Sequence, residues 1–306
     1  MRKPRALRAG DRVAIVAPGS GCSAQELEGG AAELRRLGFD PVYTSAVSER
    51  TLFSAGSADL RARDFLVAWA DPAVAALVAL RGGYGSAQLL PYLDPVVVAA
   101  APKLFVGYSD TTALLSWLTC HAGVTALHGP MVDRRLSKGP EGYDVASLLA
   151  ISRGDTGMVL ACDDATVVHH GEARGVLLGG TLTQLVASLG TPYVFAPPEG
   201  CILFIEDVNE RPYRIHRMLT QLAQAGVWGK ARGLVFGEMR GCDEPNGGPT
   251  AIDAIRHALE AFPGPVFCGF PSGHTLGPFV TLPFGTEVRV TTRPAAAVVV
   301  EESPVA

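Results

Sequence analysis

The sequence lacks the features of disulfide-stabilised, zinc-binding, membrane-spanning and nucleic-acid-binding proteins. Its six cysteines are scattered over 306 residues without a C-x-x-C pair, so neither a disulfide framework nor a zinc knuckle is expected. The basic N-terminus, MRKPRALRAGDRVAIVAPGS, has an apolar run too short for a signal peptide or a membrane span. The net charge is −4 and no basic block occurs, which argues against a nucleic-acid partner. We therefore expect a cytoplasmic protein with reduced thiols.

Phosphate-binding fingerprints are also missing. The glycine-rich stretch RGGYG, Arg81 to Gly85, follows an apolar run, but it contains neither G-x-G-x-x-G nor G-K-[ST]. Glycines make ordinary tight turns as well. A nucleotide site is therefore not expected there.

The first third of the chain alternates apolar strand signals with helical ones. Strands are predicted in RVAIVAPGS, FDPVYT, VAALVALRGG, KLFVGYS and VTALHG, and Ser23 is a candidate cap for the first helix. Buried apolar strands that alternate with helices predict a parallel, doubly wound sheet. In such sheets ligands bind at the carboxyl ends of the strands, where PGSG, RGGYG, GYSD and HGPM are placed.

The pattern suggests two domains with a connection between them. We expect an α/β domain over residues 1–135, a linker region over 136–172, where LSKGPEGYD and RGDTG are linker-like, and a β-rich domain over 173–306. Near the end, VTLPFG, TEVRVTT and AAAVVVEES are predicted to be closing antiparallel strands.

One serine stands where a strand turns sharply into a helix. In KLFVGYSDTTALL, Ser109 follows the apolar run and precedes the helical pattern. A serine before a helix is a common N-cap. It is also the place of a nucleophile at a strand-to-helix elbow, which Gly107 favours, although the elbow motif has glycine where this chain has Thr111. The local pattern leaves both interpretations open.

A serine nucleophile needs a base and a group that orients the base. Of the seven histidines, His274 lies in the glycine-flanked PSGHTLG, a setting that suits a functional side chain, and His128 at a strand end is a candidate supporting group. Glu206 ends the apolar run CILFI, where a carboxylate needs a partner; an ion pair with Arg211 or Arg214 is the alternative.

Several blocks in one order carry a family resemblance. They are VAPGS, RGGYG, KLFVGYSDTTALL, HGPM, GGTLTQLVASLGTPY, ILFIEDVNERPYRIHRML and GHTLGPFVTLPFG. The chain resembles the LD-carboxypeptidases, a serine peptidase family (S66) that includes muramoyltetrapeptide carboxypeptidases. The resemblance implies a flavodoxin- or amidotransferase-like N-terminal domain, a mostly β C-terminal domain and a site between them. It also implies a cytoplasmic homodimer without metal or organic cofactor.

The resemblance assigns roles to residues as well. It implies a catalytic triad of Ser109, His274 and Glu206, with the Asp110 N–H just after the serine, at a helix start, and an amide of Gly83 as oxyanion donors. Arg81 is a candidate for the substrate carboxylate, or it is paired with Asp110 or a surface acid. The implied reaction releases terminal D-alanine from murein tetrapeptides, free or linked to sugar or nucleotide.

Two other functions are weighed against this one. A related branch of the family cleaves peptidyl-nucleotide antibiotics as a self-immunity enzyme and shares the triad. The short GCDEPNGG after Arg240 favours murein peptides, because a nucleotide-peptide hydrolase would be expected to have a larger recognition loop. A non-catalytic peptide-binding module is the alternative of another class, and the complete triad argues against it.

Overall fold

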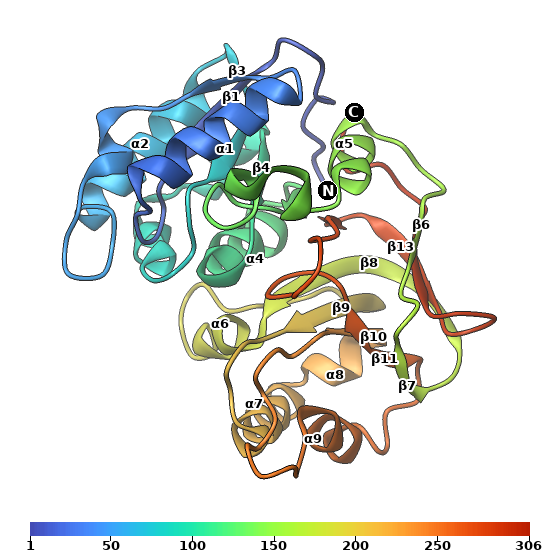
Figure 1. The fold of residues 1–306 in the computed structure, drawn as a ribbon. Coiled ribbons are helices and arrows are strands. Elements are labelled where there is room, and N and C mark those ends of the chain that lie inside the picture. The colour runs from blue at the N-terminus through green and yellow to red at the C-terminus, as the bar shows by residue number, and fades with distance from the viewer.

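The computed structural model describes residues 1–306 and contains two sheets (Figure 1). The first has six strands in the order β12-β5-β4-β3-β1-β2, and β1 to β5 are parallel to one another. Its elements are β1 (Arg12–Val16), α1 (Ala24–Arg36), β2 (Asp40–Val42), η1 (Ser45–Ser48), α2 (Ala58–Ala70), β3 (Val74–Ala79), η2 (Ser86–Tyr92), α3 (Pro95–Ala100), β4 (Leu104–Gly107), η3 (Ser109–Thr111), α4 (Thr112–Cys120) and β5 (Ala126–His128). The predicted doubly wound domain is confirmed.

The strand order of the first sheet places its ligand-binding edge. Because β1 lies between β2 and β3, the order reverses between β1 and β3, and ligands bind outside the carboxyl ends of strands at such a point. Local signals set the elements around it. Ser23 caps α1 through a capping box with Glu26, as predicted, and Gly38 follows the helix with φ of 91°.

The second sheet has eight strands in the order β6-β14-β13-β8-β9-β10-β11-β7. Its middle strands, β8 to β11, are parallel, and antiparallel strands flank them. The elements are β8 (Glu172–Thr181), α6 (Leu182–Ala187), β9 (Cys201–Glu206), α7 (Pro212–Gln224), α8 (Val227–Lys230), β10 (Ala231–Gly237), α9 (Ala251–Ala258), β11 (Val266–Phe270), β12 (Leu282–Phe284), β13 (Glu287–Thr291) and β14 (Ala297–Val300). The C-terminal half is thus rich in β-structure, as expected, with helices added.

Residues 136–172, expected to be a linker, form regular structure. They contain η4 (Leu136–Glu141), α5 (Val145–Arg153), β6 (Val159–Ala161) and β7 (Thr166–His169). The strands β6 and β7 pair with β14 and β11 at the two edges of the second sheet. The polar, glycine-rich composition belongs to turns between these short elements. Where one domain ends and the next begins stays a prediction.

The two halves are not separate bodies. One core of 64 buried hydrophobic residues contains both the first sheet and residues of the second, such as Phe204 and Phe267, and a smaller core of 22 lies on the other side of the second sheet. The strand β12 returns to the first sheet and pairs antiparallel with β5, Leu282 opposite His128. Of the three predicted closing strands, only β13 and β14 pair in the second sheet. None of the helices is both long and apolar enough to cross a bilayer.

Candidate active site

The serine turn, Gly107–Thr111, joins β4 to α4 through η3. Ser109 has φ of 61°, in the left-handed region that non-glycine residues rarely adopt. A Cβ on Gly107 would lie 2.5 Å from Thr111 Oγ1, and this hydroxyl donates to the Tyr108 carbonyl at 2.8 Å. The threonine that departs from the elbow motif therefore braces the turn, and glycine at 107 leaves room for it.

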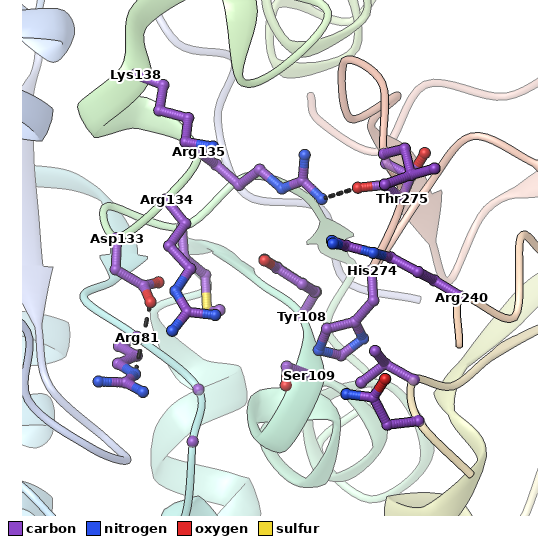
Figure 2. Close-up of a pocket in the computed structure, with 16 residues that line it drawn as sticks. Arg81, Tyr108, Ser109, Asp133, Arg134, Arg135, Lys138, Arg240, His274 and Thr275 are labelled. Carbon is purple, nitrogen blue, oxygen red and sulfur yellow. Dashed lines mark hydrogen bonds and ion pairs between the residues drawn. The ribbon is translucent and has the colours of Figure 1, made fainter. Parts of the chain in front are cut away.

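Ser109 does not act as a helix cap. Neither η3 nor α4 has a side chain that caps its first amides. Figure 2 shows Ser109 beside the His274 ring in the wall of a cavity. Of the two interpretations that the sequence leaves open, the geometry fits the strained elbow.

The glycine loop, Arg81–Ser86, lies against the serine turn. A Cβ on Gly82 would lie 2.9 Å from Ser109 Cβ and 3.1 Å from the Asp110 nitrogen. The N–H groups of Gly82 and Gly83 make no backbone hydrogen bond. Only glycine at 82 allows this close approach, so the loop and the turn enclose a small space beside the serine with free amide donors.

Asp110 holds the glycine loop in place. Its carboxylate accepts from the N–H groups of Gly85 at 3.2 Å and Ser86 at 2.8 Å, and the Ser86 hydroxyl donates to the Asp110 carbonyl. Gly83, expected as an oxyanion donor, lines the cavity, but the space where its Cβ would lie is filled by Ser20. Gly82 is thus the loop residue packed most closely on Ser109. Nothing in the sequence separates it from Gly83.

The carboxylate and the imidazole meet at the carboxyl ends of the second sheet. Glu206 ends β9 and is fully buried, and its Oε2 accepts from His274 Nδ1 at 2.7 Å and from the His274 N–H at 2.9 Å. Its Oε1 accepts from the hydroxyl of Thr181, the opposite residue on β8. The alternative ion pairs are absent, because Arg211 and Arg214 pair with Glu244 and Glu210.

These contacts set the charges of the pair. Burial alone would raise the pKa of Glu206, but the charge and hydrogen bond of His274 outweigh it and lower that pKa. Burial alone would lower the pKa of His274, but the charge and hydrogen bond of Glu206 raise it. An ionised Glu206 therefore orients the ring through Nδ1 and leaves Nε2 free.

The histidine loop, Gly273–Gly277, needs a glycine beside the carboxylate. Gly273 has φ of 80°, and a Cβ there would lie 2.5 Å from Glu206 Oε2. On the next strand, β10, a Cβ on Gly237 would lie 2.7 Å from Glu206 Cβ. Both glycines allow the backbone to pack closely around Glu206. This close packing explains why a glycine precedes His274 in the sequence.

A short hydrogen-bonded chain connects the serine turn to this pair. Thr112, the first residue of α4, accepts at its hydroxyl from the Thr181 N–H at 3.1 Å. The Thr181 hydroxyl in turn donates to Glu206. The packing of α4 on β8 therefore places the helix that follows Ser109 against the strand next to Glu206.

Ser109 and His274 line one cavity of about 420 Å³ (Figure 2). Five cationic side chains line it, and Asp133 is the one acidic side chain in its wall. The cations are Arg81, Arg134, Arg135, Lys138 and Arg240. Arg81 pairs with Asp133 at 3.5 Å and donates to the Gly21 carbonyl at 3.1 Å. Arg81 is therefore paired, but with the buried Asp133 rather than with Asp110 or a surface acid. The cavity suits a ligand that carries negative charge.

Backbone strain is concentrated at this cavity. Four non-glycine residues have positive φ, and three of them, Ser109, Arg134 and Asn209, line it. The fourth, Met239, precedes the cavity residue Arg240. Strained backbone gathers at functional sites. The sequence analysis missed Arg134, Asn209 and Arg240, because neither strain nor a shared cavity leaves a local signal in the sequence.

The remaining histidine candidates make no hydrogen bond to the triad residues. His128 is fully buried among aromatic rings without a partner for either ring nitrogen. Burial lowers its pKa to about 4. His216 and His257 form an exposed pair at 2.8 Å on α7 and α9. No group of three or more His, Cys, Asp or Glu side chains could hold a metal ion.

Known proteins are similar to this chain over most of its length. The description of the LD-carboxypeptidase N-terminal domain matches residues 13–129, and that of the C-terminal domain matches residues 174–290. The chain belongs to the LD-carboxypeptidase family. The murein tetrapeptide carboxypeptidase of Pseudomonas aeruginosa is 33% identical over 86% of this chain and 88% of its own length. The resemblance seen in the sequence is confirmed, and the protein is a serine carboxypeptidase.

Solved structures and a second branch of this LD-carboxypeptidase family complete the comparison. The crystal structure of muramoyltetrapeptide carboxypeptidase from Oxalobacter formigenes aligns with a TM-score of 0.83 and 28% identity, over 96% of this chain and 99% of that one. The microcin C7 self-immunity protein of Escherichia coli is 25% identical over 84% of this chain and 83% of its length. Membership of the family therefore leaves the substrate to be decided.

Proposed function

We propose that this carboxypeptidase releases the terminal D-alanine of murein tetrapeptides by a triad of Ser109, His274 and Glu206. The observation that carries the proposal is the 2.7 Å hydrogen bond between His274 and the buried Glu206, in the wall of the cavity that Ser109 lines. The relative that is named a murein tetrapeptide carboxypeptidase supports the substrate.

The chemistry follows from the atoms that remain free. Both hydrogen bonds of His274 to Glu206 use Nδ1 and the backbone N–H, so Nε2 takes the proton of Ser109 as its oxygen attacks the scissile carbonyl. His274 then passes this proton to the amine of the leaving D-alanine. Water hydrolyses the acyl-enzyme with His274 as base again. Glu206 stays ionised and stabilises the imidazolium.

The developing oxyanion needs donors beside the serine. The Asp110 N–H follows Ser109 at the start of a helical turn, where the backbone dipoles favour negative charge. The free N–H groups of Gly82 and Gly83 face the same region from the glycine loop. We assign the oxyanion hole to Asp110 and this loop, with Gly83 as first predicted and Gly82 as its neighbour.

The cationic wall accounts for an exopeptidase acting on an acidic peptide. A murein tetrapeptide carries a terminal carboxylate and further carboxylates along its length, which guanidinium groups bind through paired hydrogen bonds. Arg81 keeps a side-chain exposure of 37% beside the glycine loop despite its pairing with Asp133, so it stays the candidate for the terminal carboxylate. A cytoplasmic location, a homodimer and the division at residues 136–172 belong to the same proposal.

Release of D-alanine tests the proposal. Purified protein is incubated with L-Ala-γ-D-Glu-meso-diaminopimelate-D-Ala, and free D-alanine is measured beside Ser109→Ala. We expect the wild type to release it, and the variant to lose on the order of 10⁴-fold or more in rate. A fluorophosphonate probe should label the wild type and not the variant.

The outcomes separate the parts of the proposal. Labelling that persists in Ser109→Ala would reject Ser109 as the nucleophile. A protein that is labelled at Ser109 yet releases no D-alanine would keep the serine hydrolase and reject murein tetrapeptides. A peptidyl-nucleotide substrate would then be tested next, because the self-immunity relative shares the family. A protein neither labelled nor active would support the binding-module alternative.

A further inference from the structure

Arg135 reaches from the first half of the chain into the histidine loop. It lies between β5 and η4, directly before η4, and its guanidinium donates to the carbonyls of Gly273 at 3.1 Å, Thr275 at 2.7 Å and Gly277 at 3.2 Å. Figure 2 shows the bond to Thr275. A fourth bond, 3.2 Å, goes to the Gly142 carbonyl. Three of its four acceptors therefore belong to the five residues that carry His274.

This arginine has no carboxylate partner. Arg135 is buried, with 9% of its surface exposed, and forms no ion pair. The Phe279 ring lies 5.6 Å from its guanidinium carbon. Backbone carbonyls, this ring and the nearby Tyr108 hydroxyl surround the guanidinium, and a cation in a poorly solvated place without a carboxylate partner is unfavourable. Burying such a group lowers the stability of the fold, so we expect Arg135 to have a role beyond packing.

The opposite side of the loop is held by an anion. Glu238, next to the end of β10, accepts from the Leu276 N–H at 2.8 Å and from the Thr275 hydroxyl. The carbonyls of the histidine loop thus face Arg135, and its donors face Glu238. Both neighbours are charged, and together with Glu206 they restrict the loop from three sides.

Charges around His274 oppose each other. The groups that face it from the surrounding elements are Glu206, Asp207, Arg135, Tyr108, His128 and the cavity cation Arg240. Glu206 and Asp207 favour the imidazolium and raise the pKa of His274, whereas the charge of Arg135 acts to lower it. A general base must be neutral before it can take a proton.

We propose that Arg135 is a positioning residue for His274. It fixes the histidine loop to the first half of the molecule through three carbonyls, and its uncompensated charge opposes premature protonation of the imidazole. The inference rests on the proposed role of His274 as the base. It makes the ionisation of a side chain in the second half depend on a residue supplied by the first.

Two substitutions separate position from charge. Arg135→Lys keeps the charge but cannot reach several carbonyls with a planar fork, so the rate should fall about 10-fold while the acid limb of the pH profile stays in place. Arg135→Gln also removes the charge, so the rate should fall about 10²-fold, and the acid limb should move to higher pH.

The readout is the rate at which a small neutral fluorophosphonate modifies Ser109 between pH 5 and 9. This probe carries no carboxylate, so a role of Arg135 in binding the substrate would leave its rate unchanged. It also works whether or not murein peptides are the substrate, which keeps failure of this inference distinct from failure of the proposed function. Wild-type labelling whose rate shows no acid limb would reject His274 as the base and this inference with it.

A matched control is Arg61, the other buried arginine, which donates mostly to backbone carbonyls. Arg61 donates to the carbonyls of Gly56, Pro18 and Gly85 and to the side chain of Gln88, all in the first half and away from the histidine loop. Arg61→Lys should lower stability without moving the acid limb. Labelling of Arg135→Lys at the wild-type rate, or an acid limb of Arg135→Gln that coincides with the wild type, would overturn the inference. If Arg135→Gln does not fold, the labelling rate of Arg135→Lys decides.

Discussion

The serine turn and the histidine loop face one cavity, yet they are held in different ways. The serine turn is braced by Thr111, four residues after Gly107, and by a glycine loop in the same half of the chain. The histidine loop depends on partners far away in the sequence. Glu206 precedes His274 by 68 residues, and Arg135 precedes Thr275 by 140.

The serine turn is thus supported mainly by local contacts, whereas the histidine loop is assembled from both halves of the chain. The contacts that brace Ser109 most closely, those of Thr111 and the glycine loop, come from the first half, although Thr112 and Tyr108 beside it also contact the second half. The orientation of His274 needs both halves, since its carboxylate and its arginine come from different sheets. Damage to the histidine loop should therefore affect stability and activity together, whereas a change at the serine hydroxyl should affect activity alone.

The largest effect in the histidine loop is expected from Glu206→Gln. The amide keeps the shape of Glu206 but removes the charge that orients and stabilises the imidazolium. We expect D-alanine release to fall roughly 10³- to 10⁴-fold, with the acid limb of the pH profile moved down as the support for the charged ring is lost. Steady-state kinetics from pH 5 to 9 measure both. A rate within tenfold of the wild type would contradict the role of Glu206.

One added methyl group at Gly273 should disrupt the histidine loop. Gly273→Ala forces an alanine to φ of 80° and brings its Cβ within 2.5 Å of Glu206 Oε2. We expect a loss of about 2 kcal/mol in the free energy of unfolding and about 10²-fold in kcat/KM. Urea unfolding and D-alanine release are the measurements.

The control for Gly273→Ala lies in the same loop. A Cβ on Gly277 would meet nothing within 4 Å, and this residue does not have positive φ. Gly277→Ala should therefore leave the free energy of unfolding within about 0.5 kcal/mol of the wild type. Equal losses of unfolding free energy in the two variants would mean that any substitution in the loop is destabilising. The contact with Glu206 would then not explain the effect of Gly273→Ala.

The last prediction concerns stability alone, at the boundary between the two sheets. His128 is neutral and buried in the folded state with a pKa lowered to about 4, while the unfolded chain takes up a proton near pH 6.5. Because the unfolded state then binds more protons, this histidine lowers stability as the pH falls from about 6.5 to 4. The total is about 3 kcal/mol. His128→Phe should remove this loss while it keeps the aromatic packing.

Urea unfolding of His128→Phe and of the wild type at several pH values measures this contribution of His128 to stability. The difference in the free energy of unfolding between the two proteins should grow in favour of the variant as the pH falls below 6.5. Glu206 and His274 titrate as well, but they are present in both proteins and cancel to first order. A difference that does not change between pH 7 and 4 would contradict the prediction.

The structural features that the sequence predicts correctly are mainly those set by neighbouring residues in the chain. The alternation of strands and helices, the Ser23 cap and the position of Ser109 at a strand end follow from short-range patterns, and the structure has each of them. The site residue Glu206 was also visible, because a carboxylate at the end of a buried strand needs a partner.

The remaining features depend on distant contacts. No pattern near Arg135 indicates that its acceptors follow 138 to 142 residues later. The return of β12 to the first sheet has the same cause, because its apolar sequence fits either sheet equally. His274 could be selected from its glycine-flanked loop, but its pairing with Glu206 came from the family resemblance. The positive φ of Arg134 is likewise set by surroundings that the local sequence does not reveal.

Because β12 and the histidine loop follow Ser109 by more than 160 residues, the order of synthesis matters to the cell. A nascent chain on the ribosome carries the reactive serine long before it carries the histidine. Under the proposed roles, the growing polypeptide is inactive until His274 and then β12 have been synthesised and β12 has paired with the first sheet. A chain that ends at residue 270 would lack His274 and would therefore have no activity under these roles.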